Sequence, residues 1–179
     1  PWPPIYAKAD QVLMKSLEEA GIRLGNTPLC REGETFLDAY YAWRGKGTIE
    51  KTTLSALNER LQQKGFPDVP TTVLRGALDD MYAVTQQNWY LEEDAIPTLT
   101  ALQEAGYRLG MISNTSDDKN VQQLVDRWGL RPFFESIITS AGCGIRKPDR
   151  QIFQLALEHF QVPPEQAVMV GDLLEADVL

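Results

Sequence analysis

The chain has 179 residues, 43% of them hydrophobic, which is enough to bury a core and argues against intrinsic disorder. Its formal net charge of -8 disfavours nucleic acid or an anionic membrane surface as the main partner. No apolar run approaches the ~18 residues of a membrane span, so no membrane partner is expected either.

Residues 1–91 have helical periodicity in four segments and no strand pattern. Pro1–Pro4 predicts an extended linker, because prolines are poorly tolerated inside a helix. Four helices are then expected: one carrying Val12, Leu13 and Leu17 and ending at Gly21, one over Glu34–Arg44, one from an N-cap at Thr48 to Gly65, and one from Thr71 through Met81. Four helices with short connections predict a small antiparallel bundle.

Residues 92–179 alternate between helix and strand patterns. Three strands are expected, over Arg108–Ser113, Phe134–Thr139 and Ala167–Val170. A helix over Asp94–Ala105, with Ile96, Leu99 and Leu102 inward, precedes the first strand, and a helix with Val121, Leu124, Val125 and Trp128 on one face follows it. A helix over Asp149–Phe160, which buries Phe153, Ala156, Leu157 and Phe160, lies between the second and third strands. This alternation predicts an α/β fold with a parallel sheet.

The cysteines give an expectation about the compartment. Only Cys30 and Cys143 occur, and their separation matches no metal-binding pattern. We therefore expect two reduced thiols in a cytoplasmic protein, rather than a disulfide of a secreted one.

Ser113 ends the first apolar strand, shortly before a helix begins. A hydroxyl and exposed backbone N–H groups at such a place suit a bound phosphate or oxyanion. Alternatively, Ser113, Asn114 and the polar residues after them are ordinary turn and cap residues.

Lys147 stands before Pro148, which removes a backbone donor and stiffens the loop. A held ammonium there would neutralise charge on a phosphoryl group. The alternative is a solvated surface lysine, which is the commoner environment of this residue.

Asp172 follows an apolar run and a glycine, and Asp177 comes five residues later. A carboxylate at the end of a buried strand is costly unless it is paired or bound to a cation, and oxygen ligands are what Mg²⁺ prefers. Alternatively, these acids cap the next helix and stabilise its N-terminal dipole.

Taken together, the three pieces resemble the motifs of the haloacid dehalogenase superfamily of hydrolases. Its second motif is an apolar strand ending in Ser or Thr, as at Ser113; its third is a Lys, often before Pro-Asp, as at Lys147; its fourth is Gly-Asp with a second acid downstream, as at Asp172 and Asp177. The resemblance implies a Rossmann-like parallel-sheet core over 92–179, and residues 1–91 look like the helical cap domain of some members.

The resemblance also implies roles for these residues. Ser113, Lys147 and Asp177 would be catalytic, and Ser113, Asn114 and Lys147 would bind the substrate. Asp172 would hold Mg²⁺ as cofactor. The activity implied is that of a phosphatase acting on a small phosphorylated metabolite through an aspartyl-phosphate.

The family's first motif, Asp-x-Asp, which supplies the nucleophile, has no counterpart in this sequence. Because the chain begins at Pro1 and ends just after Asp177, we expect a fragment, incomplete at both ends, that is inactive without its parent. Three alternatives stay open: a 2-haloacid dehalogenase, a sugar-phosphate mutase, and a family member that has lost its nucleophile and acts as a binding or regulatory module.

Overall fold

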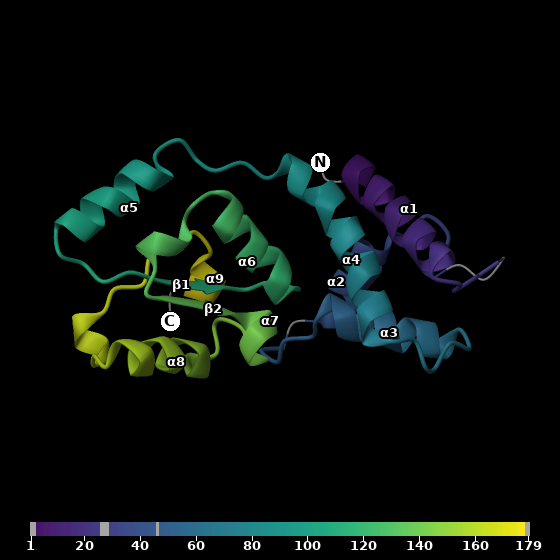
Figure 1. The fold of residues 1–179 in the computed structure, drawn as a ribbon. Coiled ribbons are helices and arrows are strands. Elements are labelled where there is room, and N and C mark those ends of the chain that lie inside the picture. The colour runs from purple at the N-terminus through teal and green to yellow at the C-terminus, as the bar shows by residue number, and fades with distance from the viewer. Residues whose placement is uncertain (1–2, 26–28, 46, 178–179) are drawn as a thin grey trace. The chain divides into compact units, whose positions relative to one another are not determined.

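A computed structural model of the chain describes residues 3–25, 29–45 and 47–177 (Figure 1). They form two compact units, which are described separately. The helical unit comprises Pro1–Lys46 and Lys51–Tyr90, and the α/β unit comprises Gly47–Glu50 and Leu91–Leu179. No helix of the described residues is long and apolar enough to span a membrane.

The helical unit is built from four amphipathic helices and a short 3-10 turn. They are α1 (Pro3–Glu19), α2 (Phe36–Arg44), α3 (Thr53–Gln63), α4 (Thr71–Thr85) and η1 (Gln86–Asn88). Helices α1 and α4 pack against each other, and Leu13, Leu17, Leu78 and Met81 are fully buried. The predicted helical stripes therefore form a common core, which also encloses Phe36 and Tyr40.

Two predictions for this unit are wrong. Helix α1 begins at Pro3, so Pro3 and Pro4 lie in its first turn, where a missing N–H costs nothing; Pro1 and Trp2 lie outside the described residues. The N-cap of α3 is Thr52, whose hydroxyl accepts from the Ser55 N–H. Thr48 lies outside that helix because its hydroxyl donates to Asp149 instead, at 3.0 Å.

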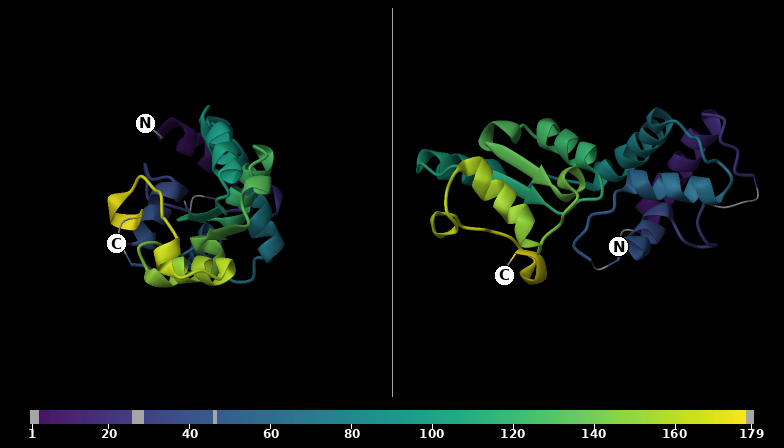
Figure 2. Two further views of the ribbon diagram at one scale, coloured as in Figure 1. Left: turned by 90° about the vertical axis from the view of Figure 1, so that its left-hand side faces the viewer. Right: turned by 90° about the horizontal axis from the view of Figure 1, so that it is seen from below.

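The α/β unit contains two parallel strands with helices before, between and after them (Figure 2). Its elements are α5 (Ala95–Glu104), β1 (Gly110–Ser113), α6 (Asp118–Arg127), η2 (Arg131–Phe133), β2 (Ser136–Thr139), α7 (Ser140–Cys143), α8 (Arg150–Phe160), η3 (Pro164–Gln166) and α9 (Leu174–Asp177). Gly110 pairs with Ser136 and Ser113 with Thr139, so both strands end at the same edge. The predicted α/β fold with a parallel sheet is confirmed.

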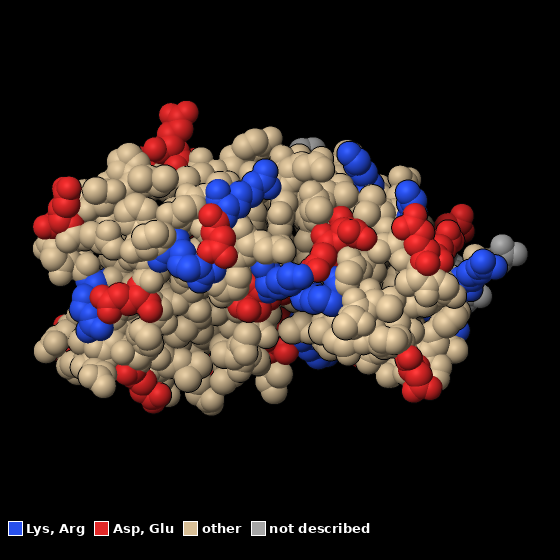
Figure 3. Space-filling view, viewed as in Figure 1, with Lys and Arg blue, Asp and Glu red and all other residues tan. Residues whose placement is uncertain are grey.

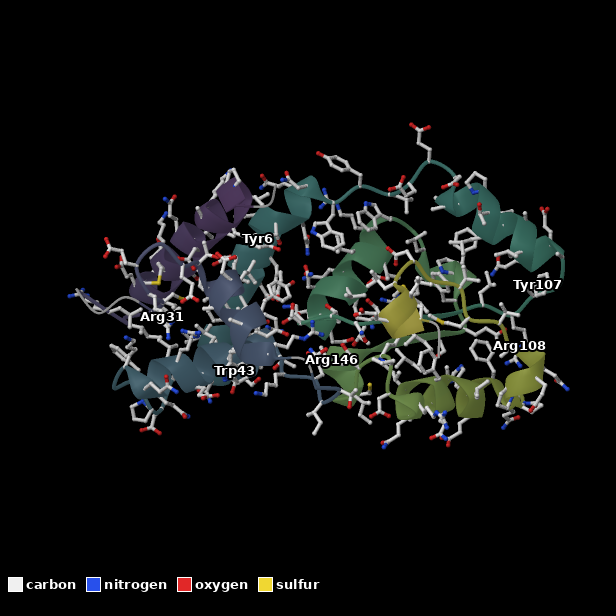
Figure 4. All side chains as sticks on the ribbon, turned by 180° about the vertical axis from the view of Figure 1, so that it is seen from behind. Tyr6, Arg31, Trp43, Tyr107, Arg108 and Arg146 are labelled. Carbon is white, nitrogen blue, oxygen red and sulfur yellow. The ribbon has the colours of Figure 1, made fainter. Side chains whose placement is uncertain are left out.

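Arg108 anchors the opposite edge of the sheet, at the amino end of β1 (Figure 4). Its guanidinium donates to both carboxylate oxygens of Glu135 and to the Phe160 carbonyl at the end of α8. A cation is favourable at a helix C-terminus, and the bidentate pair fixes the strand starts together. On the face shown in Figure 3, acidic and basic side chains are interspersed rather than gathered by sign.

The predicted strand Ala167–Val170 is not formed. A strand exists only through hydrogen bonds to a partner, and the described sheet consists of β1 and β2 alone. Val168 and Val170 are accordingly 88% and 86% exposed.

The inward faces predicted for two helices are also largely uncovered. In α5, Ile96 and Leu102 are exposed and Leu99 is half-buried, and the helix has no buried residue. In α8, Ile152 is the fully buried residue, whereas the predicted Phe153, Ala156, Leu157 and Phe160 are half-buried.

Candidate active site

The first component of the candidate site is the hydroxyl at the carboxyl end of β1. Ser113 pairs in register with Thr139, so the strand ends and the loops after them lie at one edge. Within the described part of the chain the Ser113 hydroxyl has no hydrogen-bond partner, and its side chain is only half-buried. It is thus free to bind a ligand at the edge where α/β proteins bind theirs.

Asn114 links this strand end to the loop that carries Lys147. Its side-chain N–H donates to the Lys147 carbonyl at 2.9 Å, and its side-chain oxygen accepts from the Lys147 N–H at 2.8 Å. The amide thereby satisfies both backbone groups of one residue, as a paired strand would. Asn114, expected to bind substrate, holds Lys147 in place in this arrangement.

Lys147 is an inward-facing lysine, not a solvated one. Its ammonium lies 2.5 Å from Oδ1 of Asp177, and the two side chains are 10% and 4% exposed. Oδ2 of Asp177 accepts from the Leu173 N–H at 3.1 Å. The hydrogen bond from Lys147, followed by that from the Leu173 backbone, lowers the pKa of the Asp177 carboxyl below its usual value.

Gly171 permits the tight loop that brings Asp177 to this position. A Cβ placed on Gly171 would lie 2.2 Å from Asp177 Oδ2 and 2.6 Å from Asp177 Cβ, well inside van der Waals contact. A residue without a side chain is required there because of close approach, not because of its backbone angles. The Gly-Asp pattern thus has a steric basis in this chain.

Asp172 lies next to that loop and points into solvent. It is exposed and has no hydrogen-bond or ion-pair partner among the described residues. Among those residues no cluster of three His, Cys, Asp or Glu side chains could enclose a metal. A free carboxylate nevertheless fits Mg²⁺, which often takes one or two protein carboxylates and completes its shell with water and phosphate. Asp177 is already engaged by Lys147 and Leu173.

The segment Gly47–Glu50, hereafter the strap, is part of this site's framework. Ile49 forms an antiparallel bridge with Ile145; the Glu50 N–H donates to the Gly144 carbonyl and the Arg146 N–H to the Thr48 carbonyl, both at 2.8 Å. The buried Arg146 side chain, labelled in Figure 4, donates through Nε to the Gly47 carbonyl. The strap therefore fixes the loop immediately before Lys147.

Two residues of the site were not found by sequence reasoning, Glu50 and Ser140. The Ser140 hydroxyl lies 2.6 Å from Glu50 Oε2 and accepts from the Thr115 N–H at 2.8 Å. Ser140 comes directly after the apolar strand β2, whereas Ser113 is the last residue of β1, so its position was a usable signal. Glu50 gave none, because its partner lies 90 positions away.

The geometry therefore collects chemically complementary groups from three separated segments. A free hydroxyl, a buried ammonium paired with a carboxylate, and an exposed carboxylate lie on loops tied to one another by hydrogen bonds. A fixed ammonium stabilises charge that develops on an oxyanion, and a hydroxyl donates to it. In an α/β fold, such an arrangement suits an anionic ligand group.

Comparison with known proteins identifies the class. The model of the haloacid dehalogenase-like hydrolases matches residues 6–179, so the chain belongs to this family. A ribulose-1,5-bisphosphate 5-phosphatase of Halopiger xanaduensis is 30% identical over 99% of the chain and 74% of its own length. A glyceraldehyde 3-phosphate phosphatase of Methanopyrus kandleri is 39% identical over 48% of the chain, a match that spans 36% of that relative's length.

Solved structures agree with this assignment. A phosphatase of the same family from Thermococcus onnurineus is 28% identical, with a TM-score of 0.60 over 98% of the chain and 73% of that protein. A 2-haloacid dehalogenase from Pseudomonas syringae is 25% identical, with a TM-score of 0.65 over 98% and 74%. The family prediction made from the three motifs is confirmed.

Proposed function

We propose that the protein to which this chain belongs is a Mg²⁺-dependent phosphatase that hydrolyses a phosphate ester of a small metabolite. The observation that carries the proposal is the buried Lys147–Asp177 pair, held beside the end of β1 by Asn114. The names of the related phosphatases support the same substrate class, and they make phosphate esters of short sugars the first candidates.

In this proposal the residues of the candidate site have distinct roles. Ser113 donates its hydroxyl hydrogen to a phosphoryl oxygen, and Lys147 offsets the charge of the phosphoryl group and of the attacking carboxylate. Asp177 holds the Lys147 ammonium in place, and Asn114 fixes the backbone from which that ammonium projects. Asp172 would hold the Mg²⁺, which supplies Lewis-acid stabilisation of the phosphoryl oxygens.

The reaction needs a nucleophilic carboxylate, and neither Asp10 nor Asp80 is placed to supply it. Asp10 accepts from the Phe36 N–H, and Asp80 accepts from the Ser16 hydroxyl, both in the helical unit. We therefore place the nucleophile outside the described residues. Its oxygen would attack phosphorus while the ester oxygen leaves and takes up a proton; water would then cleave the aspartyl-phosphate to release phosphate and restore the carboxylate.

We further propose that the helical unit is a cap that selects the substrate, and that the protein works in the cytoplasm. A cap excludes bulk water during turnover and carries the contacts that distinguish substrates. Both described cysteines, Cys30 and Cys143, are free thiols, which supports a reducing compartment.

The test is turnover of a panel of phosphate esters by the full-length protein, with and without Mg²⁺. We expect phosphate release that depends on Mg²⁺ and falls by about 10²-fold or more in Asp172→Asn, because one ligand loses its charge. Asp80→Asn serves as the control, since that acid is bonded to Ser16 in the helical unit. Halide release from a 2-haloacid without metal, phosphate retained on an isomerised product, or no turnover of any substrate would each replace this proposal with one of the alternatives.

A further inference from the structure

We propose that Glu50 is a positioning residue of the phosphoryl site. It acts through Ser140 on the turn that follows Ser113 and through the strap on the loop that precedes Lys147. The inference rests on the proposed function for its kinetic consequence, but its structural part can be measured without any activity.

The first observation is a relay of three residues, Glu50, Ser140 and Thr115, of which the first two are buried. Ser140 is fully buried and Glu50 is 8% exposed. The Ser140 hydroxyl has one hydrogen to donate and lies 2.6 Å from Glu50 Oε2, whereas the Thr115 carbonyl is more distant at 3.1 Å. Donation to the carboxylate is favoured on both distance and charge. It leaves a lone pair of the same oxygen directed at the Thr115 N–H, 2.8 Å away.

The consequence falls on the residues beside the reacting group. Thr115 is separated from Ser113 only by Asn114, whose side chain holds both backbone groups of Lys147. The Thr115 N–H belongs to the peptide bond between Asn114 and Thr115. Fixing that peptide group therefore also orients the backbone from which the Asn114 side chain projects. The carboxylate of Glu50 thus acts on the hydroxyl and on the ammonium of the site without contacting substrate.

The second observation is that the backbone around Glu50 supports the other side of the site. The Glu50 N–H donates to Gly144, and the Arg146 N–H donates to Thr48. The strap belongs to the α/β unit, although the chain before and after it belongs to the helical unit. The strap therefore packs with the α/β unit rather than with the residues adjacent to it in sequence. Its backbone and the buried Glu50 carboxylate hold the loop before Lys147 and the turn after Ser113.

Burying the Glu50 carboxylate costs desolvation free energy, which a contact between uncharged side chains would avoid. Burial of a charged group is unfavourable unless charge-assisted hydrogen bonds offset it. Ser16 and Asp80 make a pair of the same chemistry at 2.7 Å, but on the exposed surface of the helical unit. That pair is a matched control for the buried one.

The test compares Glu50→Ala, Glu50→Gln, Ser140→Ala and Asp80→Ala in the full-length protein. The first readout is amide hydrogen exchange of the peptides that contain Thr115 and Arg146. We expect exchange to be faster by about tenfold or more in Glu50→Ala and Ser140→Ala, and unchanged in Asp80→Ala. Glu50→Gln should stay near the wild type, because the Gln oxygen still accepts from Ser140.

The second readout is steady-state hydrolysis of the best phosphate ester. Glu50→Ala should lower kcat by about 10- to 100-fold and change KM by less than about threefold, because positioning affects the reacting geometry more than substrate binding. Glu50→Gln should restore most of kcat. The double variant Glu50→Ala/Ser140→Ala should lose no more than the worse single variant, since both act through one relay.

Each contrary result has a distinct meaning. Unchanged exchange and unchanged kcat in a folded Glu50→Ala or Ser140→Ala protein would overturn the proposal. Failure of both variants to fold would make the contact a folding determinant and overturn it as well. A wild-type protein without phosphatase activity would refute the proposed function, while the exchange readout would still decide whether Glu50 holds the two loops.

Discussion

Replacing Gly171 with alanine is the sharpest steric test of the site. The added Cβ would lie 2.2 Å from Asp177 Oδ2 and 2.3 Å from Asp177 Cγ, whereas an ordinary contact begins at 3.4 Å. Both contacts are to one short, buried side chain, so Asp177 or its loop must move by about 1 Å, a displacement that can cost about 10²-fold in rate when it reaches the reacting groups. We expect Gly171→Ala to lower kcat of phosphate ester hydrolysis by about that factor.

Gly76→Ala is the matched control for this substitution. Gly76 is exposed within α4, and a Cβ there meets nothing within 4 Å. Alanine in a helix interior is favoured over glycine by about 1 kcal/mol, so this variant should keep full activity and melt about 2–4 °C higher. Steady-state kinetics and thermal melts of the two full-length variants measure these changes in kcat and in melting temperature. Wild-type kcat in Gly171→Ala would refute the reasoning, because Asp177 could then not be held where the structure places it.

Further predictions concern pH, thiol reactivity and helix capping. The pKa of Asp177 is lowered in the folded protein, so the ionised Asp177 carboxylate stabilises the fold above the ordinary Asp pKa of 3.8, and this stabilisation is lost as pH falls through the lower folded value. Urea titrations between pH 6 and pH 3 should therefore show an acid-induced loss of stability. That loss should be smaller in Lys147→Met, which lacks the ammonium that lowers the pKa of Asp177. Burial raises the pKa of Cys30 to about 11, so its alkylation by iodoacetamide at pH 8 should be about 10²-fold slower than after unfolding, and equal rates would contradict this. Thr35→Ala removes the capping box that Thr35 forms with Asp38 at the start of α2, which should cost about 1 kcal/mol in urea unfolding; an unchanged midpoint would argue against the cap.

The position of Ser113 could be predicted because parallel strands bring their carboxyl ends to one end of the sheet. Lys147 and Asp177 could be singled out from local patterns, a lysine before a proline and an acid downstream of Gly-Asp, but their contact with each other depends on loops and not on a strand end. The helical stripes in residues 3–85 were readable for a similar reason, since helix periodicity is a local property of the sequence.

The parts that failed depend on contacts between distant residues. Thr48 has the residue type of an N-cap, but its hydroxyl donates to Asp149, 101 positions away. Val168 and Val170 have strand propensity, yet a strand is defined by its neighbour, and no described strand lies beside them. Glu50 could not be found because local patterns do not connect it to Ser140 and Gly144, with which it forms hydrogen bonds.

The most direct measurement of the central claim is a double-variant cycle on kcat in the full-length protein, using Lys147→Met, Asp177→Asn and their combination. If the ammonium and its carboxylate act as one unit at the phosphoryl group, each single variant loses about 10²-fold or more, and the combination loses little beyond the worse single variant. Losses that multiply, or a Lys147→Met protein that turns over phosphate esters at the wild-type rate, would show that the pair does not serve the reaction.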